Sequence, residues 1–214
     1  MTSTTLPAVS TEQATATSTT LAVLPAQMLY VAARFASKDS AKGPLCYINV
    51  RKADDTITIA STDRHRLFRV RIEDTNNAYY LQRELMLSPS AFKKRIAKAA
   101  FTFVTDQGTA EMRGSIPDLI QSVPCSTGCD SPFPECDRLI PDTFTGTPGA
   151  PIAFNADYLA SFLKEVARFC DNGIVTMQFN MPTTPLVFTG RTTLDGTGLR
   201  VTMEYLLMPV QIRG

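Results

Sequence analysis

Residues 60–67 read Ala60-Ser-Thr-Asp-Arg-His-Arg-Leu67, and they join two segments in which apolar and polar residues alternate. An alternation of period two is typical of half-buried strands, so this stretch predicts an antiparallel hairpin with a polar turn. Two interpretations of the turn stay open: an ion pair of Asp63 with Arg64 or Arg66, or a functional site around the single histidine, His65. The apolar positions of the two strands are Ile57, Ile59, Phe68, Val70 and Ile72.

The composition excludes several classes of function. The chain has 214 residues, and its 21 basic and 20 acidic side chains nearly cancel, so any attraction to nucleic acid must come from local clusters. No segment approaches the roughly 18 consecutive apolar residues of a membrane span, and the N-terminal residues lack the pattern of a secretory signal. We therefore expect a cytoplasmic protein with no membrane partner.

The cysteines do not indicate a metal site. Five is an odd number without a disulfide framework, and the spacing of Cys125, Cys129 and Cys136 lacks the paired CxxC motifs of structural zinc sites, so free thiols are favoured. With one histidine and no phosphate-binding loop, the sequence has no catalytic constellation. It therefore predicts no metal and no cofactor, and an enzyme is the least favoured class of function.

A pattern of one short strand, one helix and three strands occurs three times along the chain. The helices are expected to begin at Pro25, Pro89 and Ala156, with Ser88 and Asn155 as caps of the second and third. A single unit has one helix on one face of a small sheet, which is too thin to enclose a core, so adjacent units must share one. The fold class is therefore α+β, with helices on one face of antiparallel sheets. The expected strands are 46–50, 56–61 and 67–72, then 100–105, 109–113 and 119–123, then 174–179, 186–189 and 199–210.

Each expected helix carries basic residues opposite its apolar ones. On the second helix, Phe92, Ile96 and Ala99 recur at helical spacing and should face the sheet, while the basic residues between them have no acidic neighbour. Such residues often form only a solvated surface, but their recurrence in three units favours a common surface that contacts DNA phosphates without reading sequence. The candidate DNA-binding residues are Arg34, Lys38, Lys93, Lys94, Arg95, Lys98, Lys164 and Arg168.

Four segments occur in a recognisable order. They are Ser61-Thr-Asp-Arg-His-Arg-Leu67, Phe133-Pro-Glu-Cys-Asp-Arg-Leu-Ile-Pro141, Phe154-Asn-Ala-Asp-Tyr-Leu159 and Tyr205-Leu-Leu-Met-Pro-Val210. Together they resemble the β sliding clamp of bacterial DNA polymerase III, whose corresponding segments are a TDGHRL turn, a FPDYxRxxP link, a FNxxYL helix start and a YxxMPM strand. This chain departs from the family pattern at Arg64, where the family turn has glycine.

The resemblance implies a DNA clamp fold: a ring of β-α-β-β-β units, two per domain, whose helices line a hole for double-stranded DNA. It also implies that DNA polymerase and other replication or repair proteins dock on the outside through a short linear peptide. An apolar floor with arginines at its rim suits such a peptide. The peptide-binding residues that the resemblance implies are Thr62, His65, Arg66, Leu67, Pro134, Arg138, Leu139, Leu206, Met208, Pro209 and Val210.

The units also suggest a domain organisation. We expect a disordered tail over 1–20, a complete clamp-like domain of two units over 21–146, and a clamp-like half-domain of one unit over 147–214. Chains of the family have six units and their rings have twelve, so four chains of this length would close a comparable ring. The third units are expected to meet across a two-fold axis through the apolar face of their helix, and the first units likewise. The apolar face comprises Tyr158, Phe162 and Val166.

Two alternatives stay open. A simple dimer would form an open arc in place of a closed ring. A clamp-derived adaptor or inhibitor would bind replication proteins without encircling DNA.

Overall fold

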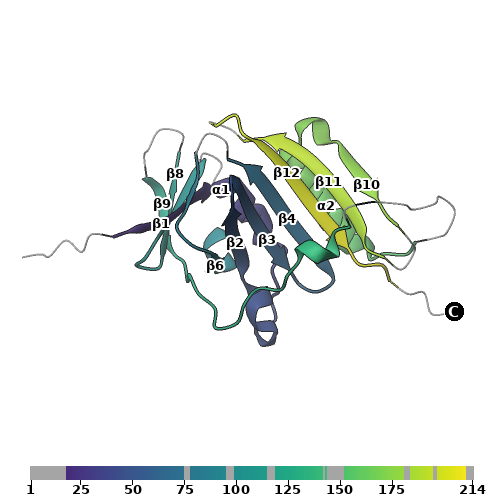
Figure 1. Cartoon of the computed structure of the whole chain (residues 1–214), viewed down its shortest axis with the longest axis horizontal. Helices are drawn as coiled ribbons and strands as arrows, with labels where there is room; N and C mark the ends of the chain where they lie inside the picture. The colour runs from purple at the N-terminus through teal and green to yellow at the C-terminus, as the bar shows by residue number, and fades with distance from the viewer. Residues whose placement is uncertain are drawn as a thin grey trace, which may run out of the picture.

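The computed structural model describes residues 18–74, 78–94, 99–114, 119–141, 143, 152–180, 184–194 and 197–210. Within these residues the chain forms two antiparallel sheets with helices packed against them, which confirms the α+β prediction (Figure 1). The five-stranded sheet has the order β5 (Tyr80–Leu81), β1 (Thr20–Pro25), β7 (Phe101–Thr105), β8 (Thr109–Arg113) and β9 (Leu119–Pro124). The seven-stranded sheet has the order β10 (Val175–Gln178), β11 (Leu186–Thr193), β12 (Arg200–Leu207), β4 (Arg66–Glu73), β3 (Thr56–Thr62), β2 (Ile48–Ala53) and β6 (Leu85–Leu87).

The hairpin predicted around residues 60–67 is confirmed. Strands β3 and β4 pair in an antiparallel register that places Ile59 opposite Val70 and Ile57 opposite Ile72. All four of these side chains are fully buried. Because opposite residues of an antiparallel pair share one face of the sheet, the apolar alternation in the sequence corresponds to the face that covers the core.

The first two units share a core by exchanging strands. β1, the first strand of the first unit, pairs with β7 of the second unit, and β6, the first strand of the second unit, pairs with β2 of the first. The exchange gives each small sheet an extra strand from its neighbour. The predicted sharing of a core between adjacent units is therefore confirmed, through strand pairing as well as through packing.

The third unit joins the first unit edge to edge. Strand β12 pairs with β4 over the whole length of both, with Tyr205 opposite Phe68. As a result, the units lie in the spatial order second, first, third, and β9 and β10 are the outer strands at the two ends (Figure 1). We predicted from the sequence that the first units would meet other copies. That expectation is wrong for this fold, because both edges of the first unit are already paired inside the chain.

The helices differ from the prediction in length. The first helix, α1 (Ala26–Ala32), is shorter than expected, and Pro25 is its N-cap. The second is described only as a 3₁₀ helix, η2 (Pro89–Phe92), and residues 95–98 lie outside the described residues. Ser88 does not cap it, because the Ser88 hydroxyl lies 2.8 Å from that of Ser90 instead. Three further 3₁₀ segments are η1 (Ser40–Cys46), η3 (Asp137–Leu139) and η4 (Asp171–Gly173).

The third helix, α2 (Ala156–Phe169), is confirmed together with its cap. The Asn155 side chain accepts hydrogen bonds from the backbone amides of Asp157 and Tyr158, at 2.9 and 3.2 Å. Phe162 is fully buried and stacks on Tyr205, with ring centroids 4.1 Å apart. The prediction that another copy covers Phe162 and Val166 is therefore wrong, because the helix packs this face on its own sheet.

Candidate functional site

The turn between β3 and β4 is held by Asp63. Its carboxylate accepts backbone hydrogen bonds from His65 and Arg66, at 3.0 and 3.1 Å, and pairs with Arg66 Nε at 2.9 Å. Of the two interpretations of this turn, the ion pair is confirmed, and Arg66 is the partner. Arg64 adopts a φ of +82°, in a region of backbone conformation that favours glycine. The backbone of Arg64 is therefore strained.

The Arg66 side chain connects the first unit to α2. Its guanidinium lies over the rings of Phe35 and Tyr158, at 5.0 and 4.9 Å from their centroids, and donates a hydrogen bond of 2.7 Å to Ser161 Oγ. Cations over aromatic faces are attracted by the ring quadrupole, more strongly where water is excluded. In the single chain this arginine is therefore occupied by internal contacts, whereas the sequence placed it at a peptide pocket.

A small apolar cluster lies on the face of the seven-stranded sheet opposite the helices. Leu67 and Leu206 are almost completely buried there and face each other across β4 and β12. The segment 133–140 crosses this face and covers part of the cluster with Phe133, Cys136 and Ile140. The buried environment raises the pKa of the Cys136 thiol to about 11, so this cysteine acts as an apolar residue at neutral pH.

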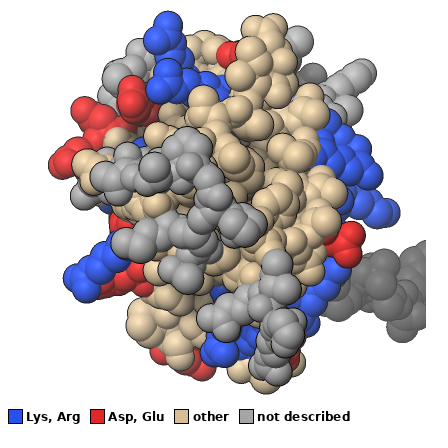
Figure 2. Space-filling view, turned by 90° about the vertical axis from the view of Figure 1, so that its right-hand side faces the viewer, with Lys and Arg blue, Asp and Glu red and all other residues tan. Residues whose placement is uncertain are grey.

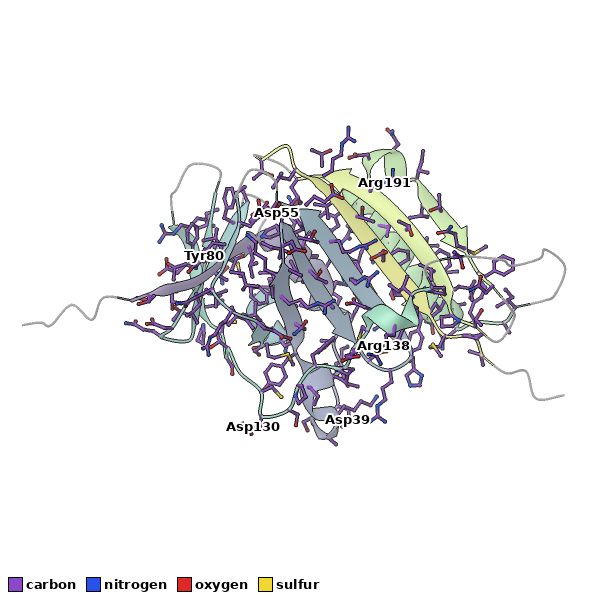
Figure 3. All side chains as sticks on the ribbon, viewed as in Figure 1. Asp39, Asp55, Tyr80, Asp130, Arg138 and Arg191 are labelled. Atoms are coloured by element: carbon purple, nitrogen blue, oxygen red, sulfur yellow. The ribbon has the colours of Figure 1, made fainter. Side chains whose placement is uncertain are left out.

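Exposed apolar side chains occur in or next to the segments that form the cluster. Leu139, Met208 and Val210 are 48%, 39% and 51% exposed. Figure 3 shows Arg138 on the 133–140 segment, in front of the ends of β4 and β12, where its side chain pairs with Glu135 at 3.1 Å. Pro134 is exposed and Pro209 is partly buried beside them. We call Leu67, Leu139, Leu206, Met208 and Val210 the outer apolar patch.

Hydrogen bonds tie the turn to this patch. The amide of Met208 donates to the carbonyl of His65 at 3.1 Å, and the Thr62 hydroxyl donates to the carbonyl of Arg66 at 2.7 Å. The His65 ring stacks on Tyr158, with centroids 6.0 Å apart. Together with the cluster of Leu67, Cys136 and Leu206, these contacts place parts of three separated segments side by side. That these segments bind a peptide stays a prediction.

An ion network that the sequence did not reveal fastens the 133–140 segment to the sheet. Asp137 pairs with Arg51 and with Arg69, the latter at 2.7 Å, and Arg69 also pairs with the buried Glu204 at 2.7 Å. Burial alone would raise the pKa of the Asp137 carboxyl, but the hydrogen bonds from both arginines lower it below its usual value. The only sequence signal was Arg69, which lies between the apolar residues Phe68 and Val70 of β4.

A basic cavity of about 770 Å³ lies beside the C-terminal end of α1. Its lining includes Arg34, Lys38, Lys93 and Arg66, together with the hydroxyl residues Ser37, Ser88, Ser90 and Ser161. No carboxylate residue is among the described residues that line it. Arg34 and Arg66 are already paired with Glu165 and Asp63. The cavity's lysines, Lys38 and Lys93, together with the hydroxyl groups, form a suitable environment for a phosphate.

The candidate DNA-binding residues differ in whether an acidic side chain pairs with them. Arg34 and Arg168 both pair with Glu165, at 2.8 and 3.6 Å, and the Glu165 side chain is only 2% exposed. Lys94 and Lys164 are exposed. The other two candidates, Arg95 and Lys98, lie outside the described residues. Nothing in the sequence indicated that one buried glutamate would pair with two of the arginines.

Two further observations concern sites of other kinds. Among the described residues, no group of three or more histidine, cysteine, aspartate or glutamate side chains is arranged to hold a metal ion. No helix in the described part of the chain is long and apolar enough to cross a membrane.

Comparison with solved structures identifies the architecture. The β subunit of DNA polymerase from Streptococcus pyogenes superimposes with a TM-score of 0.63 and 16% identity, covering 98% of this chain and 68% of its own. The polymerase III β subunit of Thermotoga maritima gives a TM-score of 0.61 and 15% identity over 98% of this chain and 71% of its own. The chain has the DNA clamp fold.

Two further sliding clamps match with similar coverage and lower sequence identity. The DNA polymerase sliding clamp of Bacillus subtilis gives a TM-score of 0.62 at 11% identity, and the Helicobacter pylori β clamp bound to a DNA ligase peptide gives 0.62 at 10% identity. They cover 98% of this chain and 67% and 68% of their own chains. No family model and no curated protein matches the sequence. At these identities the likeness establishes the fold.

Proposed function

We propose that this protein is a sliding-clamp-like tether that assembles with other copies into a ring around duplex DNA. The observation that carries the proposal is the clamp fold combined with a basic cavity whose described lining has no carboxylate. Phosphate contacts of this kind hold DNA without reading its sequence. The proposed role is non-catalytic and uses no metal or cofactor. We also propose that the chain consists of a complete domain over 21–146 and a half-domain over 147–214. The seven-stranded sheet contains strands of both.

The DNA contact is tested by reversing charges in the basic cavity. The Lys38→Glu/Lys93→Glu variant should bind DNA more weakly on unrelated sequences, because each lost phosphate contact reduces the salt dependence of log K by roughly 0.9. The matched control is Lys52→Glu, an exposed lysine on β2 that does not line the cavity. Binding measured by fluorescence anisotropy over a salt series decides. An unchanged salt slope in the double variant, or a strong preference for one sequence, contradicts the proposal.

We further propose that the outer apolar patch docks replication or repair proteins through a short peptide. The patch combines exposed aliphatic side chains with a rim that includes Arg138, and short peptides with aliphatic or aromatic anchors fit such surfaces. The Leu139→Ser/Met208→Ser variant should bind a fluorescent peptide with these anchors at least ten-fold more weakly. Tyr80→Ser, at a tyrosine that is 47% exposed on β5, is the control. Equal peptide affinity in the patch variant and the control contradicts the assignment.

One observation favours an adaptor that binds partners without encircling DNA. Glu165 holds Arg34 and Arg168, so two of the six described basic candidates are already paired with an acid. An adaptor would bind the anchor peptide with normal affinity while showing no salt-dependent retention on DNA. The two assays above therefore separate the alternatives.

A further inference from the structure

Within the chain, two clamp units complete each other by exchanging their first strands. β6 lies directly before η2 and adds to β2, with Leu87 opposite Ile48. β1 lies directly before α1 and adds to β7, with Leu24 opposite Thr102. A unit of this kind therefore has one edge that receives a strand and one strand that it gives away.

The third unit also has a strand edge and a segment before its helix, but it exchanges no strand with another unit in the described part of the chain. In the described part of the chain, β10 pairs only with β11, and its other edge has no partner strand. The segment 152–154, directly before the Asn155 cap of α2, belongs to neither sheet. Its described backbone bond is at Ala153, whose carbonyl accepts from the amide of Val210 at 2.8 Å. An open strand edge is a template for pairing with another chain.

The two α-helices differ in how much of their surface is covered. In α1, six of seven residues are buried, because it packs against its own sheet and against the second unit. In α2, only four of fourteen residues are buried. The uncovered side carries a stripe of exposed apolar residues at helical spacing, Ala156, Ala160, Leu163 and Ala167.

The end of the molecule that carries α2 and β10 exposes apolar side chains. Figure 2 shows this end face-on; among its described residues, uncharged ones lie toward the middle and charged ones toward the rim. Ile174, directly before β10, and Met177, within it, are 67% and 54% exposed. An apolar centre inside a polar rim is the usual anatomy of a protein–protein interface.

We propose that two copies of this chain join through their third units, each giving residues 152–154 to the β10 edge of the other. The register that keeps core-facing side chains on one face sets Phe154 opposite Val175, Ala153 opposite Thr176 and Ile152 opposite Met177. This matches the exchange between β6 and β2, in which Leu87, the residue before the N-cap, faces Ile48, the first residue of the receiving strand. Because the exchange is reciprocal, the two copies are related by a two-fold axis.

A second copy fits this end better than an unrelated partner. It supplies a strand followed immediately by a helix, which is the combination that completes the first two units. It also places one α2 stripe against another, and small residues allow helices to approach closely. The inference deepens the proposed function, since it provides one junction of a ring, but the interface forms without DNA.

The first test measures mass in the absence of DNA. At micromolar concentration, light scattering should give at least twice the chain mass of 23.4 kDa. Leu163→Glu/Met177→Lys should halve the measured mass while the circular dichroism spectrum stays unchanged, because both side chains are already exposed in the single chain. Tyr80→Lys is the control and should keep the wild-type mass. A monomeric wild type, or a charge variant that keeps the wild-type mass, overturns the proposal.

The second test measures register. Opposite residues of antiparallel strands have Cα atoms about 4.5–5.5 Å apart, within the range that a disulfide spans. Ala153→Cys protein mixed with Thr176→Cys protein should therefore form a covalent dimer under mild oxidation. Each single variant alone, and Ala153→Cys mixed with Gln178→Cys, should give at least five-fold less, which also controls for the native cysteines. Equal cross-linking in all mixtures overturns the register. A dimer that cross-links correctly but is not retained on DNA counts against the proposed function alone.

Discussion

Replacing Arg66 with methionine tests the structural role of the arginine between the hairpin turn and α2. The substitution keeps much of the apolar stem and removes the guanidinium, which pairs with Asp63, donates to Ser161 and lies over two aromatic rings. The side chains of Arg66 and Asp63 are only 15% and 14% exposed, so solvent screens their pair little. A hydrogen bond to a charged group contributes about 1.5–3 kcal/mol, and a cation over an aromatic ring about 1 kcal/mol. We expect Arg66→Met to lower the free energy of unfolding by about 3 kcal/mol.

The assay is urea unfolding followed by circular dichroism, with Arg71→Met as the matched control. Arg71 pairs with Glu204, but its side chain is 49% exposed, so its loss should cost less than about 1 kcal/mol. Equal and small losses in the two variants would refute the reasoning and would return Arg66 to the role of a free pocket residue. A large loss for Arg66→Met alone supports its place as a contact between units.

Two further predictions concern the turn and the ion network. Arg64→Gly should be more stable than Arg64→Ala by about 1 kcal/mol in urea unfolding, because Arg64 has a φ of +82° and only glycine adopts it without strain; equal stability would contradict this. The Asp137 carboxyl has a lowered pKa in the folded chain, so its stabilising effect is present above the unfolded value of about 3.9 and is lost as the pH falls through the folded value. Between pH 6 and pH 2, Asp137→Asn should therefore lose less unfolding free energy than the wild type, and parallel losses would show that this carboxyl does not contribute.

The sequence predicted the local elements well, for physical reasons. The alternation around Ile57 and Ile59 and around Val70 and Ile72 indicates which face of each strand is buried. Asn155 has a side chain that accepts hydrogen bonds from the first backbone amides of a helix. Such signals depend on neighbours close in sequence. The resemblance predicted the clamp fold correctly, because it draws on the arrangement of a whole fold and not only on a local pattern. The peptide-binding residues that it implied stay a prediction.

Pairing between distant segments was not predictable in the same way. A strand such as β1 has the same apolar pattern whether it joins its own unit or the next one, so the exchange and the spatial order of the units were not visible. Buried charge also depends on distant neighbours. Glu165 stands between Lys164 and Val166 in the sequence, and only the fold buries its carboxylate beside Arg34 and Arg168. The same holds for Asp137, whose partners come from two strands more than sixty residues earlier.

Retention on a closed DNA circle tests the central claim most directly. The protein should be loaded on nicked circular DNA, isolated with it at a salt concentration that abolishes simple phosphate binding, and then exposed to a nuclease that cuts the circle once. A ring around the duplex stays with the intact circle and leaves after the cut, because only the topology has changed. Loss from the circle before cutting, or equal retention before and after it, would contradict the proposal that this protein encircles DNA.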